Sequence, residues 1–122
     1  MNKLVTLIPV LVLLVMNASA AEKLQHVVSF KFKSSAPPQD IKKVEDGFRA
    51  LKQKIPQMVK LEWGTNVSKE NRDKGFTHCF IVTFKSEKDR DIYIAHPDHK
   101  EFVKVVGPVL EDAFVIDFWA KD

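Results

Sequence analysis

Hydrophobic and polar residues alternate in four short segments of the chain. A period of two is typical of a β-strand, so we predict strands over residues 26–33, 58–67, 76–84 and 111–119. The more apolar face of the first strand carries His26, Val28, Phe30 and Phe32. The corresponding face of the third strand carries His78, Phe80, Val82 and Phe84.

A helical period fills the segments between these strands. From Gln39 to Lys54 apolar residues recur every three or four positions, and the prolines at 37 and 38 suit a helix entry. Two further helical segments are predicted over residues 86–95 and 98–106. Ser86 is a candidate cap for the first of them, and His96-Pro97 separates the two.

The predicted order of elements is β-α-β-β-α-β, with the second helix broken. This order is that of the ferredoxin-like split βαβ fold, an α+β class with a four-stranded antiparallel sheet and helices on one face. The second face of the third strand carries Thr77, Cys79, Ile81 and Thr83. These side chains carry no charge and are partly apolar, which is unusual for a solvent-exposed face. We therefore expect this face to pack on a partner, as in a homodimer.

The first twenty residues have a different character. Lys3 precedes an apolar run over residues 4–16, and Ala18-Ser19-Ala20 is a small-x-small cleavage pattern. The run of about thirteen residues is shorter than the ~20 needed to span a bilayer. We therefore predict a signal peptide over residues 1–20, cleaved after Ala20, and an exported single domain over residues 21–122 that is secreted or periplasmic. No stable membrane anchor is expected after cleavage.

Composition and charge narrow the class of protein. The chain has 122 residues with 19 basic and 16 acidic side chains, and cleavage would remove only the charge of Lys3. A net charge of about +2, spread among interspersed lysines and acids, does not favour a nucleic-acid partner. Cys79 is the one cysteine and lies in an apolar segment, so we predict a buried small hydrophobe. An intermolecular disulfide or a reactive thiol are the alternatives.

Four histidines and one tyrosine are the candidates for chemistry: His26, His78, His96, His99 and Tyr93. If the apolar strand faces point to the helices, His26 and His78 look into one apolar cavity. A neutral imidazole can take a proton near pH 7, and a phenol can donate a hydrogen bond to a carbonyl oxygen. The alternatives are structural: a helix cap for His96, satisfied buried groups for His26 and His78, and core packing for Tyr93. His99 is the best catalytic candidate.

Metal and cofactor signals are weak. His96 and His99 are three residues apart, but no carboxylate or cysteine set completes a metal site. The glycines occur singly, so no glycine-rich phosphate loop is present. We expect no metal and no cofactor.

Five short motifs follow one another along the chain. They are residues 26–33 (HVVSFKFK), Trp63-Gly64-x-Asn66-Val67-Ser68, Gly75-Phe76-Thr77-His78, Tyr93-x-x-His96-Pro97-x-His99 and Val115-Ile116-Asp117-Phe118. Together they resemble the stress-responsive α/β-barrel (Dabb) family over about residues 26–119. The resemblance implies a ferredoxin-like dimer in which two sheets pack face to face into a barrel.

One branch of that family contains plant polyketide cyclases. The resemblance to it implies that His99 is a base and Tyr93 a donor that orients a carbonyl. It also implies a cavity wall made of His26, Val28, Phe30, Val44, Phe48, Leu61, Phe80, Phe102 and Val115.

Two functional hypotheses follow. The first is a dimeric stress-response domain without a defined reaction, which holds a small apolar or aromatic ligand. The second is a polyketide cyclase-like lyase or an isomerase-like carbonyl catalyst that uses His99 and Tyr93. A haem-binding barrel with His99 as axial ligand is a third alternative. Export would separate the domain from carrier-linked intermediates, which favours the first hypothesis.

Overall fold

The computed structural model describes residues 3–4, 8–9 and 22–122. The predicted signal peptide and its cleavage after Ala20 therefore lie almost entirely outside the described residues. Within the described part of the chain, no helix is long and apolar enough to cross a membrane.

The order of elements along the chain agrees with the predicted one. The elements are β1 (Leu24–Phe32), α1 (Pro38–Lys54), β2 (Lys60–Thr65), β3 (His78–Phe84), α2 (Glu87–Ala95), α3 (Pro97–Val106), a short 3₁₀ turn η1 (Gly107–Val109) and β4 (Leu110–Trp119). The third strand begins at His78, two residues later than predicted. Phe76 belongs to the preceding turn, where its amide donates to the carbonyl of Asp73 at 3.0 Å.

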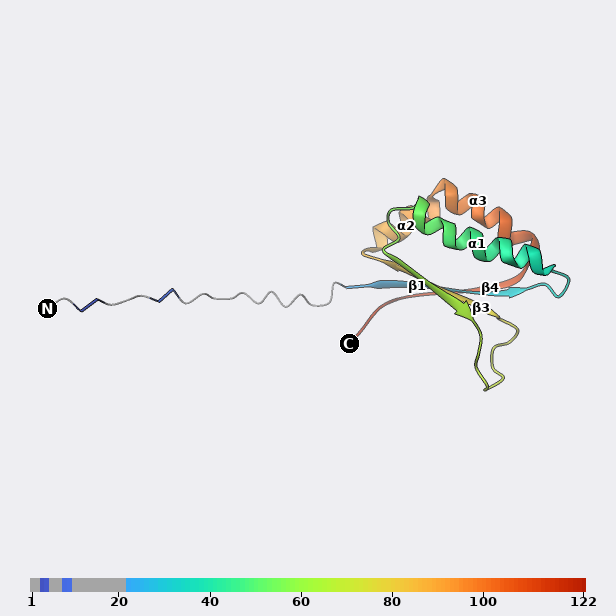
Figure 1. The fold of residues 1–122 in the computed structure, drawn as a ribbon, viewed down its shortest axis with the longest axis horizontal. Helices are drawn as coiled ribbons and strands as arrows, with labels where there is room; N and C mark the ends of the chain where they lie inside the picture. The colour runs from blue at the N-terminus through green and yellow to red at the C-terminus, as the bar shows by residue number, and fades with distance from the viewer. Residues whose placement is uncertain (1–2, 5–7, 10–21) are drawn as a thin grey trace.

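The four strands form one antiparallel sheet in the order β2-β3-β1-β4. The helices cover one face of this sheet, and the connection between β2 and β3 extends on the other side (Figure 1). This arrangement confirms the predicted ferredoxin-like α+β fold. We call the uncovered side the open face. Its residues are Gln25, Val27 and Ser29 of β1, Lys60, Glu62 and Gly64 of β2, Cys79, Ile81 and Thr83 of β3, and Phe114, Ile116 and Phe118 of β4.

The core lies between the sheet and α1. Phe48 of α1 stacks on Phe80 of β3, with ring centroids 4.1 Å apart and planes 3° from parallel. Both side chains are almost completely buried. Gly47 allows α3 to come close, since a Cβ at this position would lie 3.3 Å from the Phe102 ring. The predicted helix face of residues 39–54 is therefore the face that packs on the sheet.

A break between α2 and α3 sets the direction of the side chains around it. Proline disfavours a helical conformation in the residue before it, and His96 before Pro97 has φ −64° and ψ 137°. Nδ1 of His96 accepts a hydrogen bond from the amide of Asp98 at 3.0 Å, so His96 caps α3. Tyr93 lies just before this break and His99 just after it.

The prediction that Cys79 is buried is wrong for the single chain. Cys79 is exposed and lies on the open face, opposite Ser29 of β1. The cause is the strand alternation itself, because His78 and Phe80 point to the helices and Cys79 must point away from them.

Candidate functional site

A cavity of about 360 Å³ lies between the sheet and helices α2 and α3. We call it the helix cavity. It is lined by His26, Val28, Phe30, Phe48, Tyr93, Ile94, His99, Phe102, Val103, Val106, Leu110, Ala113 and Val115. Ile94, Val103 and Val115 are each about half exposed, so the cavity opens to solvent between the helices and the edge strand β4.

His99 lines the helix cavity, and one of its ring nitrogens bonds to the backbone. Its Nδ1 lies 3.1 Å from the carbonyl oxygen of Ile94, near the C-terminal end of α2. A carbonyl oxygen can only accept, so Nδ1 carries the proton. In the neutral ring the lone pair is therefore on Nε2, where a general base needs it.

Tyr93 lies directly beside His99. The two ring centroids are 4.6 Å apart, at an angle of 53°. The side chain is almost fully buried, and its hydroxyl makes no hydrogen bond to another residue in the described part of the chain. Burial raises the pKa of the Tyr93 phenol well above its ordinary value of 10, so the group stays protonated and can donate.

A second imidazole, that of His26, also lies close to the Tyr93 ring. The ring centroids of His26 and Tyr93 are 5.7 Å apart. Nδ1 of His26 bonds to Oδ1 of Asp117 at 2.6 Å, and Arg90 donates to Oδ2 of the same carboxylate at 3.2 Å. Since a carboxylate accepts, Asp117 holds the Nδ1–H tautomer of His26 and fixes its ring orientation.

Replacing Asp117 with alanine is expected to lower the free energy of unfolding by about 1–3 kcal/mol, because buried Nδ1–H of His26 loses its acceptor. Urea unfolding measures this change. Asp112→Ala on the same strand is the matched control, since the Asp112 carboxylate is exposed and, among the described residues, accepts a hydrogen bond only from the amide of Ala113. Equal effects of the two substitutions would show that the bond to His26 has no structural role.

The surroundings of His99 lower its pKa below the ordinary value of 6.5. Burial is the largest cause; the imidazoles of His26 and His96 act in the same direction, and the bond to the Ile94 carbonyl opposes them. The neutral base therefore persists at pH values somewhat below 6.5.

This shift predicts a pH dependence of stability. A lowered folded-state pKa means that the unfolded chain binds more protons, so stability is fully present above pH 6.5 and falls as the pH drops through that value. Unfolding curves recorded at pH values from about 7.5 to about 5, a range that spans the ordinary histidine pKa, measure the slope. His99→Gln should flatten it, and an unchanged slope in this variant would contradict the assignment.

The structure brings together eight of the twelve predicted site residues around the helix cavity. These are the two candidates for catalysis, Tyr93 and His99, and the predicted wall residues His26, Val28, Phe30, Phe48, Phe102 and Val115. Four predicted wall residues do not line it. They are Val44, Leu61, His78 and Phe80. Val44 and Phe80 are buried in the core, where Phe80 stacks on Phe48, so their side chains serve packing.

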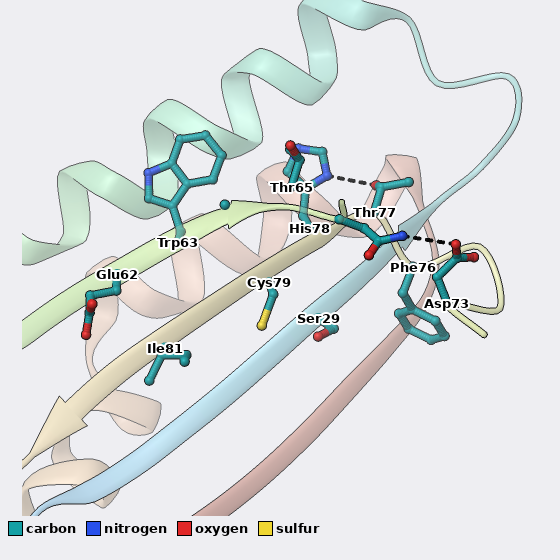
Figure 2. A pocket seen from close by; sticks show the side chains of 12 residues that line it. Ser29, Glu62, Trp63, Thr65, Asp73, Phe76, Thr77, His78, Cys79 and Ile81 are labelled. Carbon is teal, nitrogen blue, oxygen red and sulfur yellow. Dashed lines mark hydrogen bonds between the residues drawn. The ribbon is translucent and has the colours of Figure 1, made fainter. Parts of the chain in front are cut away.

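His78 departs most from its predicted place. Its ring lies on the helix side of the sheet, as expected (Figure 2), but it does not line the helix cavity. Its Nε2 bonds to Oε2 of Glu45 at 2.7 Å and its Nδ1 to Oγ1 of Thr77 at 2.8 Å. The ring stacks 6.2 Å from that of Trp63. His26 and His78 therefore do not share a cavity, and His78 is a satisfied buried group.

Sequence reasoning missed several residues at the site. The additional lining residues are Ile94, Val103, Val106, Leu110 and Ala113. Asp117, the partner of His26, was also missed, although it occurs in one of the quoted motifs. An acidic residue facing inward on a strand with Ala113 and Val115 is a signal for a buried partner.

A second hollow, of about 450 Å³, lies on the open face (Figure 2). Ser29, Gly64, Cys79 and Ile81 form its floor, and the connection between β2 and β3 forms one wall. We call it the open-face hollow. Neither the helix cavity nor the open-face hollow has a cluster of three potential metal-ligating side chains, and no such cluster occurs elsewhere in residues 22–122.

The fold and the helix cavity define a small ferredoxin-like α+β protein with a largely apolar cavity that opens to solvent. The sequence pattern of the Stress responsive A/B Barrel Domain (Dabb) matches residues 24–120, and the chain belongs to this family.

Among its relatives is the stress-response A/B barrel domain-containing protein HS1 of Arabidopsis thaliana. It is 37% identical over 94 residues, which cover 77% of this chain and 86% of HS1. Olivetolic acid cyclase of Cannabis sativa is 30% identical, over 77% of this chain and 93% of the cyclase.

Solved structures of other proteins have the same fold as this chain. The hydroxynitrile lyase of Passiflora edulis superposes with a TM-score of 0.78 at 28% identity, covering 84% of this chain and 96% of the lyase. A dimeric ferredoxin-like protein from Thermobifida fusca superposes with a TM-score of 0.71, covering 82% of this chain and 92% of that protein. At 18% identity the latter likeness concerns the fold alone.

Proposed function

We propose that this protein binds a small carbonyl compound with an apolar body in the helix cavity, and that His99 and Tyr93 act on it as base and hydrogen-bond donor. The observation that carries this proposal is the unpartnered phenol of Tyr93 beside the free Nε2 of His99 in one apolar cavity. Two relatives named as a cyclase and a hydroxynitrile lyase support an enzymatic role.

The elementary step is proton abstraction next to a carbonyl. The C–H bond on the α carbon breaks and its proton moves to Nε2 of His99. The electron pair moves into the new C–C double bond, and the carbonyl oxygen takes the negative charge. Tyr93 donates its O–H to that oxygen and stabilises the enolate, an interaction that is stronger in the transition state than in the ground state. Reversal of the step returns a proton to carbon.

The wall of the cavity limits the ligand. Apart from His26, Tyr93 and His99, its side chains are apolar. The ligand therefore needs an apolar body with few polar groups, because a polar group placed against this wall would lose its hydrogen bonds to water.

The test is deuterium exchange in D₂O. A series of alkyl and aryl methyl ketones is incubated with the protein, and loss of the α-proton signals is followed by NMR. Exchange above the rate in buffer, abolished in the Tyr93→Phe, His99→Gln double variant, supports the proposal. Binding of ketones without exchange would leave the second candidate, a ligand-binding domain without a reaction.

That second candidate is supported by the apolar mouth of the cavity. Ile94, Val103 and Val115 are exposed at the mouth, and such a rim suits the retention of an apolar molecule as well as turnover. Mass spectrometry of protein purified gently from its native source tests this candidate. A retained small molecule supports it, and an empty cavity contradicts it.

We also propose that the protein is a homodimer that pairs through the open face. Phe114, Ile116 and Phe118 of β4 are each about half exposed there, which is an unusual surface for a soluble monomer. The likeness to proteins described as dimeric supports the same view. Sedimentation equilibrium on residues 21–122 should give twice the mass of one chain at micromolar concentration, and a single-chain mass would contradict the dimer.

Export is the third part of the proposal. Its basis is the apolar run and the small-x-small pattern at residues 18–20. N-terminal sequencing of the protein from its native source should begin at Ala21, and a chain that begins at Met1 would contradict export.

A further inference from the structure

Arg90, in the first turn of α2, reaches the carboxylate on β4 that holds His26. Its Nη1 donates to Oδ2 of Asp117 at 3.2 Å, while Nδ1 of His26 donates to Oδ1 of the same carboxylate at 2.6 Å. The guanidinium nitrogens Nε and Nη2 donate to Asp91 at 3.2 and 3.1 Å. The two oxygens of Asp117 therefore serve two different donors, one from α2 and one from β1.

The second nitrogen of the His26 ring, Nε2, is accessible. Among the described residues, only Nδ1 of this ring has a hydrogen-bond partner. The one fully buried side-chain polar atom of the described residues without a partner is Oε1 of Gln57, so Nε2 of His26 keeps accessible surface. His26 lines the helix cavity, where its ring lies 5.7 Å from that of Tyr93. A ligand in the cavity can therefore reach Nε2.

The tautomer of His26 decides what Nε2 can do. In a neutral imidazole one nitrogen carries the hydrogen and the other carries a lone pair. Because Asp117 accepts from Nδ1, the lone pair is on Nε2, which can accept a hydrogen bond and cannot donate one. Besides the base His99, the cavity therefore offers a donor, the phenol of Tyr93, and a separate acceptor, Nε2 of His26.

We propose that Arg90 and Asp117 are positioning residues that hold His26 as the acceptor for a hydroxyl group of the ligand, so that the helix cavity prefers a hydroxyketone to a plain ketone. This inference rests on the proposed function and names the substrate class of the same site. The carbonyl oxygen of such a ligand accepts from Tyr93, and its hydroxyl donates to His26. A ligand without the hydroxyl leaves Nε2 unpaired in an apolar cavity, which weakens its binding.

Arg90 has a role that a substitution at Asp117 makes visible. A guanidinium only donates, so it needs an oxygen as partner. In Asp117→Asn one side-chain oxygen remains, and Arg90 takes it. The amide NH₂ group then faces Nδ1 of His26, and because an NH₂ group donates, the ring hydrogen moves to Nε2. Removing Arg90 as well frees the amide oxygen for Nδ1 and restores the original tautomer.

Three matched compounds test the ligand preference. Benzylacetone, its β-hydroxy derivative and the methyl ether of that derivative share one carbon skeleton, and only the β-hydroxy compound has a hydroxyl to donate. NMR titration at a pH of about 8, above the ordinary histidine pKa, measures their affinities. The unchanged protein should bind the β-hydroxy compound about three- to tenfold more tightly than the other two, the usual contribution of one hydrogen bond.

Two variants test the positioning residues. Asp117→Asn should lose the preference for the hydroxyl, and the double variant Arg90→Leu, Asp117→Asn should regain it. Lys88→Leu in the Asp117→Asn chain is the matched control, since Lys88 is an exposed residue of the same helix and should restore nothing. A preference that survives in Asp117→Asn, or that Arg90→Leu fails to restore, overturns the positioning role.

The nitrogen chemical shifts of the His26 ring report its tautomer without any ligand. They should show Nδ1–H in the unchanged protein and in the double variant, and Nε2–H in Asp117→Asn. A purely structural role of Arg90 would not return the hydrogen to Nδ1 when a second residue is removed. If the variants fail to fold, the unchanged protein still decides, because a hydrogen on Nε2 there overturns the proposal.

The outcomes separate this inference from the proposed function. A protein that binds none of the three compounds overturns both. A protein that binds all three equally well overturns the assignment of His26 as a hydroxyl acceptor. In that case α-proton exchange of plain ketones by His99 and Tyr93 is still observed, and the proposed function stands.

Discussion

Replacing His99 with glutamine lowers the rate of ketone α-proton exchange by about 10²–10⁴-fold, the usual contribution of a positioned general base. Glutamine cannot accept a proton at neutral pH, yet it is polar and similar in length. Its amide can still donate to the Ile94 carbonyl, which is the one hydrogen-bond partner of His99 among the described residues. The loss should therefore fall on the rate of exchange more than on ketone binding.

Tyr93→Phe tests the other half of the pair. Losing one donor to an oxyanion costs about 10²–10³-fold in rate. Because the hydroxyl has no partner among the described residues, its removal should leave the unfolding midpoint almost unchanged.

His78→Gln is the matched control for His99→Gln, since His78 does not line the helix cavity. If the His99 and His78 variants exchange equally fast per folded molecule, His99 is not the base.

The second large effect concerns stability. Phe80→Ala should lower the free energy of unfolding by about 3–5 kcal/mol, a large part of the 5–15 kcal/mol typical of a domain. Phe80 is fully buried and stacks on Phe48 from one side, with the Trp63 ring 5.4 Å away. Its removal leaves a cavity in the centre of the core that the surrounding rings cannot fill.

Urea unfolding at one fixed protein concentration measures this effect, since the stability of a dimer depends on concentration. Val105→Ala is the control. Val105 lies on the solvent side of α3 and is about half exposed, so its truncation should change stability by no more than about 0.5 kcal/mol. A loss below about 1 kcal/mol in Phe80→Ala would contradict its central place in the core.

The residues behind these two predictions differ in how far the sequence alone could identify them. Tyr93 and His99 could be singled out because their spacing around Pro97 is a local feature. The proline ends one helix and starts the next, so the residues on either side are positioned by a short stretch of chain. Phe80 could be assigned to the apolar face of a strand, but not to the centre of the core, because its depth depends on α1.

The contacts that were missed, and the residue that was placed in the wrong cavity, depend on distant segments of the chain. His26 and Asp117 are 91 positions apart, and they meet only because β1 and β4 pair in one particular register. His78 has the same alternation as His26, yet it meets Glu45 of α1 instead of the helix cavity. A periodic pattern reports which face a residue occupies and carries no information about its position along that face.

Cys79 illustrates the same limit on the open face. Its apolar neighbours suggested burial, while the pleat of β3 turned it away from the helices. The prediction assumed that a strand rich in apolar residues is buried on both faces of the sheet. The described part of the chain leaves one face of this sheet uncovered, so alternation alone does not bury a residue there.

The sequence by itself determined the order of the elements, the helical break at His96-Pro97 and the pairing of Tyr93 with His99 across it. These features follow from backbone preferences and from side-chain periods within about ten residues. Only the tertiary structure decided which histidines line the helix cavity, which carboxylate holds His26 and which side chains meet on the open face. The reason is physical: strand register and helix packing are set by contacts between segments far apart in the chain, and no local pattern encodes them.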